Sequence, residues 1–137
     1  MDHDVIGKAA EFISEKGFGC VLALIDADGY PTASTYSVSK NDSIKWVTFC
    51  TLLSGNAPNR IKKCDRASIC LNSSEEPFYN ITLVGKIEVI TDPEVKKEMW
   101  YESSEWGGPE DPNFCVLKFT TERYNLYVDE KEAVGKV

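Results

Sequence analysis

The chain has 137 residues, of which 42% are hydrophobic and 27% are charged. This balance is ordinary for a folded protein, and the length predicts a single domain over residues 1–137. No run of about 18 apolar residues is present, and the N-terminus lacks the basic-then-apolar order of a signal peptide, so we expect no membrane partner and a cytoplasmic location. The net charge of −7 disfavours nucleic acid, which is a polyanion. The expected partners are a small molecule and a second copy of the chain.

The cysteines also indicate a cytoplasmic location. Their odd number, without a signal peptide, favours reduced thiols. No CxxC pair occurs and the single histidine, His3, stands at the terminus, so no metal site is predicted. We interpret the thiols as small apolar core groups. They are Cys20, Cys50, Cys64, Cys70 and Cys115.

The first half of the chain predicts one helix and then strands. Apolar residues at helical spacing predict a helix over residues 4–16, ended by glycines at 17 and 19. Strands are predicted over 20–25, 32–38 and 44–51, the first two joined by a hairpin turn at 26–29. Residues 54–63 are predicted to be a loop that runs into a short helix, with Asn56 or Asn59 as its cap.

The second half predicts further strands and one capped helix. A strand is expected over 67–71, and strict alternation predicts a long strand over 79–90. Asp92 as a cap and Pro93 at the first position start a helix that runs to about residue 102. The last strands are predicted over 114–120 and 124–128. Six or seven short, mostly hairpin-linked strands with two or three helices indicate a mostly β (α+β) fold, a small antiparallel barrel.

No catalytic constellation is recognisable, because one terminal histidine leaves no Ser-His-Asp or Cys-His arrangement. Two segments are candidates for ligand binding. The strand at 32–37 carries small or hydroxylated side chains, which let a flat ligand approach the backbone; a solvent-facing edge strand explains them equally well. The segment 51–63 joins a loop to a helix start followed by Arg60, which favours a phosphate, although many surface helices carry such charges. In addition, Trp106 lies in a Gly/Pro-rich loop and is predicted to be a contact residue, whereas Trp46 and Trp100 are predicted to pack.

In their order along the chain, several stretches carry a resemblance that covers about residues 8–128. They are residues 26–31, 46–51, 80–88, 91–95, 108–112 and 116–119, followed by Tyr124. Together they resemble the pyridoxamine 5′-phosphate oxidase-like FMN-binding split-barrel family, in its general stress protein branch. The resemblance implies a six-stranded antiparallel split β-barrel with flanking helices and a homodimer that binds FMN at its interface.

The resemblance also implies which residues contact the flavin. The strand along the isoalloxazine ring corresponds to Thr35, Tyr36 and Ser37, and the end of the next strand to Cys50 and Thr51. The family's Ser-x-Lys phosphate motif falls on Gly55, Asn56 and Ala57. The amide side chain that opens the long strand falls on Asn80, and the loop tryptophan of the partner chain on Trp106.

This chain departs from the family pattern at the phosphate. Gly55 and Ala57 replace the serine and lysine, Pro58 follows, and Thr35 stands where the full-length oxidases carry an arginine. Each missing cation removes a charge-assisted bond of about 1.5–3 kcal/mol. Residues Ser54, Asn56 and Arg60 are the expected compensation. Restoring serine at 55 and lysine at 57 is expected to tighten FMN binding roughly tenfold.

Two hypotheses follow. The first is an FMN-binding homodimer that acts as a flavin-dependent oxidoreductase of unknown substrate. We do not expect it to be a true pyridoxamine phosphate oxidase, because the resemblance does not extend to the C-terminal segment with which those enzymes hold their substrate. The alternative is a non-enzymatic homodimer of the same barrel that has lost FMN or binds another ligand, such as a haem or a deazaflavin. A third is a small barrel without a ligand. The dimer is also expected because three Trp and six Tyr exceed what a small barrel interior holds.

Overall fold

The computed structural model describes residues 2–100 and 107–137. Its elements in chain order are α1 (Asp2–Lys16), a 3₁₀ turn η1 (Gly17–Gly19), β1 (Cys20–Ile25), β2 (Pro31–Tyr36), β3 (Val38–Asp42), β4 (Trp46–Leu52), α2 (Asn56–Lys63), β5 (Arg66–Ser73), β6 (Tyr79–Ile90), α3 (Pro93–Met99), β7 (Phe114–Val128) and β8 (Lys131–Lys136). None of the described helices is long and apolar enough to cross a membrane.

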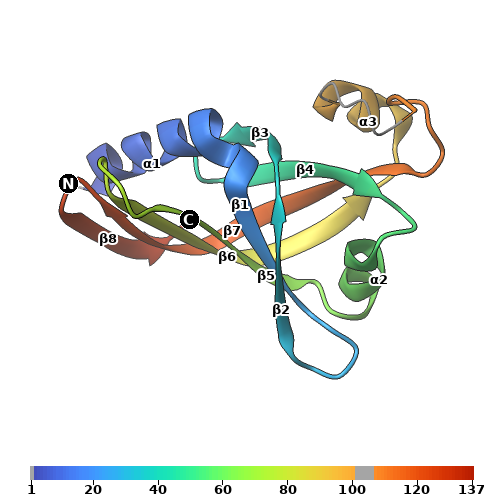
Figure 1. The fold of residues 1–137 in the computed structure, drawn as a ribbon, viewed down its shortest axis with the longest axis horizontal. Helices are drawn as coiled ribbons and strands as arrows, with labels where there is room; N and C mark the ends of the chain where they lie inside the picture. The colour runs from blue at the N-terminus through green and yellow to red at the C-terminus, as the bar shows by residue number, and fades with distance from the viewer. Residues whose placement is uncertain (1, 101–106) are drawn as a thin grey trace.

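All strands join one antiparallel sheet in the order β2-β1-β5-β6-β7-β4-β3, with β8 added beside β7. The two ends of this order, β2 and β3, are consecutive in the chain and are separated only by Ser37. The segment that they form pairs with β1 at one end and with β4 at the other, so it links both edges of the curled sheet (Figure 1). Counted as one bent strand, it gives a ring of six strands. The predicted mostly β, six-stranded antiparallel split barrel is therefore confirmed.

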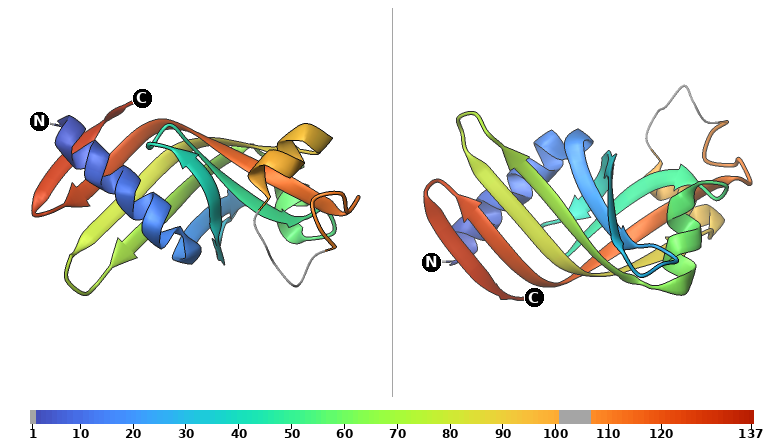
Figure 2. Two further views of the ribbon diagram at one scale, coloured as in Figure 1. Left: turned by 90° about the horizontal axis from the view of Figure 1, so that it is seen from above. Right: turned by 60° about the horizontal axis from the view of Figure 1, so that its bottom comes forward.

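The core lies on the inner face of this sheet. Alternate side chains of β4, β6 and β7, among them Phe49, Leu83 and Phe119, are buried there. Helix α1 crosses the same face (Figure 2) and contributes Val5, Ala9 and Ile13, which recur at the spacing of one helical face. We call the opposite side of β1, β2, β5, β6, β7 and β8, turned away from α1, the outer face.

A second, smaller cluster lies under α3. It consists of Cys50, Met99, Phe114 and Val116, with Trp46 and Trp100 packed against it. Both tryptophans therefore pack, as predicted. Because strand side chains alternate, β4 sends Phe49 to the main core and the next residue, Cys50, to this second cluster.

Several strand predictions need correction. The predicted strand over 32–38 breaks at Ser37, and the residues after the break form a separate strand, β3, which was not predicted. The strand predicted from residue 44 starts only at Trp46, because a turn closed by the Lys45 amide and the Asp42 carbonyl (2.8 Å) precedes it. The strands predicted over 114–120 and 124–128 are one continuous strand, β7, and β8 was not predicted.

The helix boundaries are closer to expectation. Asp92 caps α3 by accepting a hydrogen bond from the Glu94 amide (2.9 Å), and Pro93 is its first residue, as predicted. The predicted end near residue 102 lies outside the described residues. The cap of α2 is Gly55, without a side-chain hydrogen bond, so the prediction of Asn56 or Asn59 as cap was wrong.

Candidate functional site

Three of the predicted site residues, from three different elements, come together at one end of the barrel. Tyr36 is the last residue of β2, Thr51 lies near the end of β4, and Arg60 is on the second turn of α2. The Thr51 hydroxyl and the Arg60 guanidinium both lie close enough to the Tyr36 phenol to favour its ionised form. We call these residues, with the neighbouring Cys115, the Tyr36 cluster.

The surroundings of Tyr36 keep its phenol protonated. Partial burial raises its pKa above the ordinary value, and this exceeds the opposing effects of Arg60 and Thr51. The ring packs edge-to-face on Phe49, with centroids 6.0 Å apart. Burial likewise raises the pKa of the Cys115 thiol to about 11. The cluster thus offers neutral hydroxyl groups and one fixed cation, and no thiolate nucleophile at neutral pH.

The loop between β4 and α2 borders this cluster and is held by Asn113, which the sequence analysis missed. The Oδ1 atom of Asn113 accepts a hydrogen bond from the Ser54 amide (3.1 Å), and its Nδ2 donates to the Ser54 hydroxyl (3.1 Å). The carbonyl of Asn113 accepts from the Leu53 amide (2.7 Å). In the sequence, the one feature that pointed to Asn113 was its position directly after the Gly/Pro-rich loop and before a predicted strand.

Asn113 is itself anchored to α3. Its amide donates to Asp111 Oδ1 (2.9 Å), and the buried Lys96 of α3 donates its ammonium to the Asp111 carbonyl (3.0 Å). The loop that carries Ser54 is therefore positioned from α3 through two connecting residues.

The start of α2 presents free backbone amides beside the cluster. No side chain caps the helix, and its only charged residues are the basic Arg60, Lys62 and Lys63. A Cβ atom at Gly55 would lie 3.2 Å from the Leu52 carbonyl oxygen, so this turn is tight. Ala57 is 2% exposed and packs in the main core, so a side chain at this position points inward and not toward a ligand.

A cavity of about 230 Å³ lies between α2 and the β1–β2 turn. Arg60 lines this cavity and also belongs to the Tyr36 cluster. In the turn, Asp26 Oδ1 accepts hydrogen bonds from the amides of Asp28 and Tyr30, both at 3.0 Å. The lining residues are Asp26, Ala27, Asp28, Asn56, Asn59, Arg60 and Lys63.

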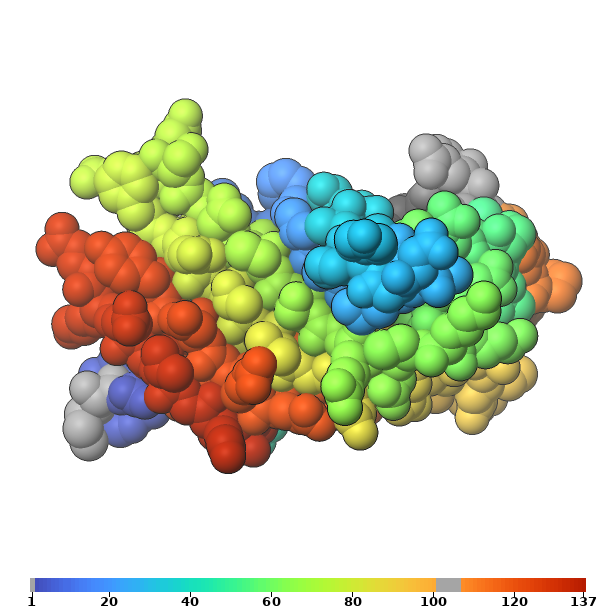
Figure 3. Space-filling view, turned by 90° about the horizontal axis from the view of Figure 1, so that it is seen from below, coloured from blue at the N-terminus to red at the C-terminus, as the bar shows by residue number. Residues whose placement is uncertain are grey.

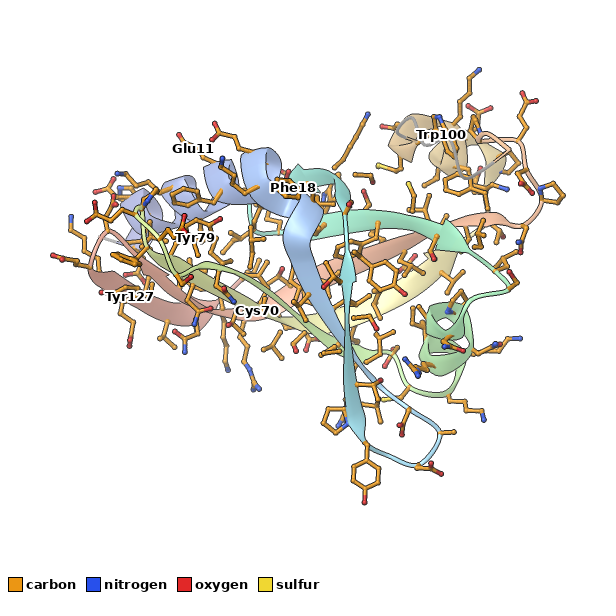
Figure 4. All side chains as sticks on the ribbon, in the orientation of Figure 1. Glu11, Phe18, Cys70, Tyr79, Trp100 and Tyr127 are labelled. Atoms are coloured by element: carbon orange, nitrogen blue, oxygen red, sulfur yellow. The ribbon has the colours of Figure 1, made fainter. Side chains whose placement is uncertain are left out.

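The remaining predicted residues lie elsewhere. Thr35 is exposed and opposes Val21 on the outer face, as expected of an edge strand. Asn80 is on the same face, where its Oδ1 accepts from the Cys70 thiol (3.3 Å); Figure 4 shows Cys70 and Tyr127 on this side and Tyr79 beneath α1.

Ser37 lies at the bend between β2 and β3 and donates to the Phe18 carbonyl (3.3 Å). The Cys50 thiol donates to the Met99 carbonyl (3.3 Å) under α3, and so faces away from Thr51. Trp106 lies outside the described residues. Among those described, no group of three or more His, Cys, Asp or Glu side chains could hold a metal ion.

The ring of six strands with a polar cluster at one end defines a small β-barrel protein with a candidate ligand site beside α2. A family model described as pyridoxamine 5′-phosphate oxidase matches residues 6–127. The match spans most of the chain, which therefore belongs to this family.

Solved structures agree with this assignment. A Clostridium acetobutylicum protein, described as related to general stress protein 26 of B. subtilis (pyridoxinephosphate oxidase family), is 25% identical over 100% of this chain and 97% of that chain, with a TM-score of 0.83. General stress protein 26 of Bacillus anthracis is 16% identical over 98% and 97% of the two chains, with a TM-score of 0.79.

A pyridoxamine 5′-phosphate oxidase-related, FMN binding protein of Nostoc punctiforme is 15% identical over 98% and 95% of the two chains, with a TM-score of 0.71. At these identities the last two structures show a common fold. A search of curated proteins found no match.

Proposed function

We propose that this chain binds FMN beside α2 and, as a homodimer, uses it as a flavin-dependent oxidoreductase of unknown substrate. The observation that carries the proposal is the meeting of Tyr36, Thr51 and Arg60 next to an uncapped helix start. Membership of the family and the likeness to a protein described as FMN binding support it.

The donors present suit a phosphate group. The amides of Asn56 and Ala57 belong to the first turn of α2 and have no intrahelical partner, whereas Pro58 offers none. The Arg60 guanidinium supplies the positive charge and the Thr51 hydroxyl a further donor. With one cation where the family motif adds a lysine, we expect FMN affinity to be lower by one charge-assisted bond.

The chemistry would come from the cofactor: a bound flavin supplies electron transfer, and the protein supplies binding and orientation. In this proposal Tyr36 and Thr51 hold the polar part of the ligand with neutral hydroxyl groups. No side chain of the Tyr36 cluster is assigned as a general acid or base.

The positions of two predicted site residues support the proposed homodimer. Thr35 and Asn80, which the resemblance places in the flavin site, lie on the outer face and not in the Tyr36 cluster. We therefore propose that a second copy completes the site. We also propose that residues 1–137 form one domain and that the protein is cytoplasmic, in keeping with its five free cysteines.

A titration tests the proposal. Fresh protein is examined for flavin absorbance, and FMN and riboflavin are then titrated by fluorescence. Arg60→Gln is expected to weaken FMN binding at least tenfold, equivalent to about 1.4 kcal/mol, and to leave riboflavin binding unchanged. Lys62→Gln, on the same helix but outside the cluster, is the control. If neither flavin binds the wild type, or if both lose affinity equally in Arg60→Gln, the proposed phosphate site is wrong.

The alternative of a non-enzymatic barrel is favoured by one observation: the family's lysine position, Ala57, is buried in the core. Such a protein would have lost FMN or would hold another ligand. The same absorbance spectrum decides between the two, because a haem shows a Soret band, a deazaflavin absorbs at shorter wavelength than FMN, and an empty barrel shows neither.

A further inference from the structure

Lys96 of α3 is a buried ammonium group without a counter-ion. It is 7% exposed, donates to the Asp111 carbonyl (3.0 Å) and lies 5.5 Å from the centroid of the Phe114 ring. No carboxylate within residues 2–100 and 107–137 forms an ion pair with it. The carboxylate of Asp111 accepts from the Asn113 amide instead (2.9 Å). Buried charges are normally paired, so this one calls for an explanation.

Holding the turn before β7 does not explain the buried charge. The turn is closed by backbone hydrogen bonds, from the Asp111 amide to the Gly108 carbonyl (3.1 Å) and from the Phe114 amide to the Asp111 carbonyl (3.0 Å). The Asp111 carbonyl therefore keeps a donor if Lys96 is removed. A lysine is not required for the shape of this turn, which leaves its positive charge as the property to be explained.

The charge of Lys96 reaches the Tyr36 cluster. Cys115, a member of the cluster, is opposite Thr51 in the pairing of β4 with β7. Burial raises the pKa of the Cys115 thiol, and the positive charge of Lys96 lowers it. Burial raises the pKa of Tyr36 in the same way, and Arg60 lowers it. Two cations, one from α3 and one from α2, therefore act on the same small group of side chains.

Lys96 is also connected to the start of α2. From the Asp111 carbonyl the contacts continue through Asn113, whose side chain forms two hydrogen bonds of 3.1 Å with Ser54. Gly55 follows Ser54 and directly precedes the uncapped amides of α2. Figure 3 shows α3 in gold, the residues after it in orange and α2 in green beside one another at one end of the molecule.

We infer that Lys96 supplies a second positive charge for the phosphate group proposed at the start of α2. Lys96 is a positioning residue: it holds Ser54 through Asp111 and Asn113, and its charge acts through the protein interior, where solvent and salt screen it less than on the surface. The inference rests on the proposed FMN site and goes beyond it. It assigns a cation from a third element that offsets part of the charge absent at Ala57.

Removal of the charge at constant length tests the inference. Lys96→Met is expected to weaken FMN binding about three- to tenfold, the effect of a unit charge on the order of 10–15 Å away at an effective dielectric constant of about 20 with salt present. Riboflavin, which lacks the phosphate, should bind as before. Lys96→Arg keeps the charge and should retain most of the affinity. Lys97→Met, exposed on the same helix, is the control. Fluorescence titration measures all four proteins.

The melting temperature of the unliganded protein separates this role from a merely structural one. Lys96→Met replaces a buried charge that has no counter-ion by an apolar side chain of similar length, so the variant should melt at the wild-type temperature or above it. Stability and FMN affinity then change in opposite directions or independently. If Lys96 only holds the loop, the variant should melt lower and lose affinity for both flavins.

The outcomes distinguish this inference from the proposed function. A wild type that binds neither flavin overturns the FMN site and the role of Lys96 together. A wild type that binds FMN, with a Lys96→Met variant that binds it equally well or loses FMN and riboflavin to the same extent, overturns the role of Lys96 alone. Loss of FMN affinity in Lys97→Met as large as in Lys96→Met would also overturn it, because the effect would then belong to the general charge of α3.

Discussion

The side chain of Asn113 forms two hydrogen bonds with Ser54. Its Oδ1 accepts from the Ser54 backbone amide (3.1 Å), and its Nδ2 donates to the Ser54 hydroxyl (3.1 Å). The two residues are 59 positions apart, so this contact connects the start of β7 to the loop before α2. The uncapped amides of α2 follow directly after Ser54. The position of the proposed phosphate site therefore depends on a residue that does not line it.

Removal of this side chain is expected to loosen the loop. Asn113→Ala loses two hydrogen bonds and should lower the free energy of unfolding by about 1–3 kcal/mol, because each contributes about 0.5–1.5 kcal/mol. Ser54→Ala loses one of them and should cost about half as much. Chemical denaturation measures both values. An equal loss in the two variants would show that the bond to the Ser54 amide contributes nothing.

The buried position of Ala57 changes what a restored lysine would do. Ala57→Lys places a long charged side chain in the core and is expected to destabilise the fold by at least about 1–3 kcal/mol, instead of tightening FMN binding. Asn56→Lys, one residue earlier and exposed, should preserve stability and tighten FMN but not riboflavin. Thermal melting and flavin titration of the two variants measure this. Tighter FMN binding by a stable Ala57→Lys protein would contradict the inward direction of this side chain.

Two buried thiols predict a loss of stability in alkali. Burial raises the pKa of Cys20 to about 12 and that of Cys115 to about 11, from the ordinary value of 9.0. As the pH rises above 9, the unfolded chain loses these protons first, so it binds fewer protons than the native state and stability falls.

The slope approaches about 1.4 kcal/mol per pH unit for each thiol between pH 9 and 11, and stability below pH 9 is unaffected by them. Urea unfolding at a series of pH values measures it. The double variant Cys20→Ala, Cys115→Ala should show a shallower decline. A decline as steep as that of the wild type would assign it to other groups, such as Tyr36.

Gly85 is expected to be irreplaceable. It lies where the pairing of β6 and β7 shifts register, and a Cβ atom there would be 2.0 Å from the Thr120 carbonyl oxygen. Since the backbone would have to move, Gly85→Ala should cost about 3 kcal/mol or more. Gly7→Ala, on α1 with nothing within 4 Å, should instead stabilise by about 0.5–1 kcal/mol. Denaturation curves of the two variants provide the comparison.

Local patterns sufficed for much of the fold. The helix over 4–16, the strand over 20–25 and the long strand over 79–90 follow from periodicity, because one face of each is buried. The strands β3 and β8 escaped prediction because they are mostly polar: β8 buries only Ala133. Their existence depends on backbone hydrogen bonds to the adjoining strands β4 and β7, which a polar side-chain pattern does not reveal.

The candidate site divides in the same way. The sequence by itself determined which residue types were available: hydroxyl groups at 36 and 51, a cation at 60, and no catalytic histidine. Only the tertiary structure decided which of them share a face. Alternation along β4 turns Cys50 to α3 and Thr51 to Tyr36, and alternation along β2 turns Thr35 outward. The sequence gives the order of the residues but not the direction of each side chain. That direction follows from sheet register and from contacts such as Asn113 to Ser54, which form only when distant segments meet.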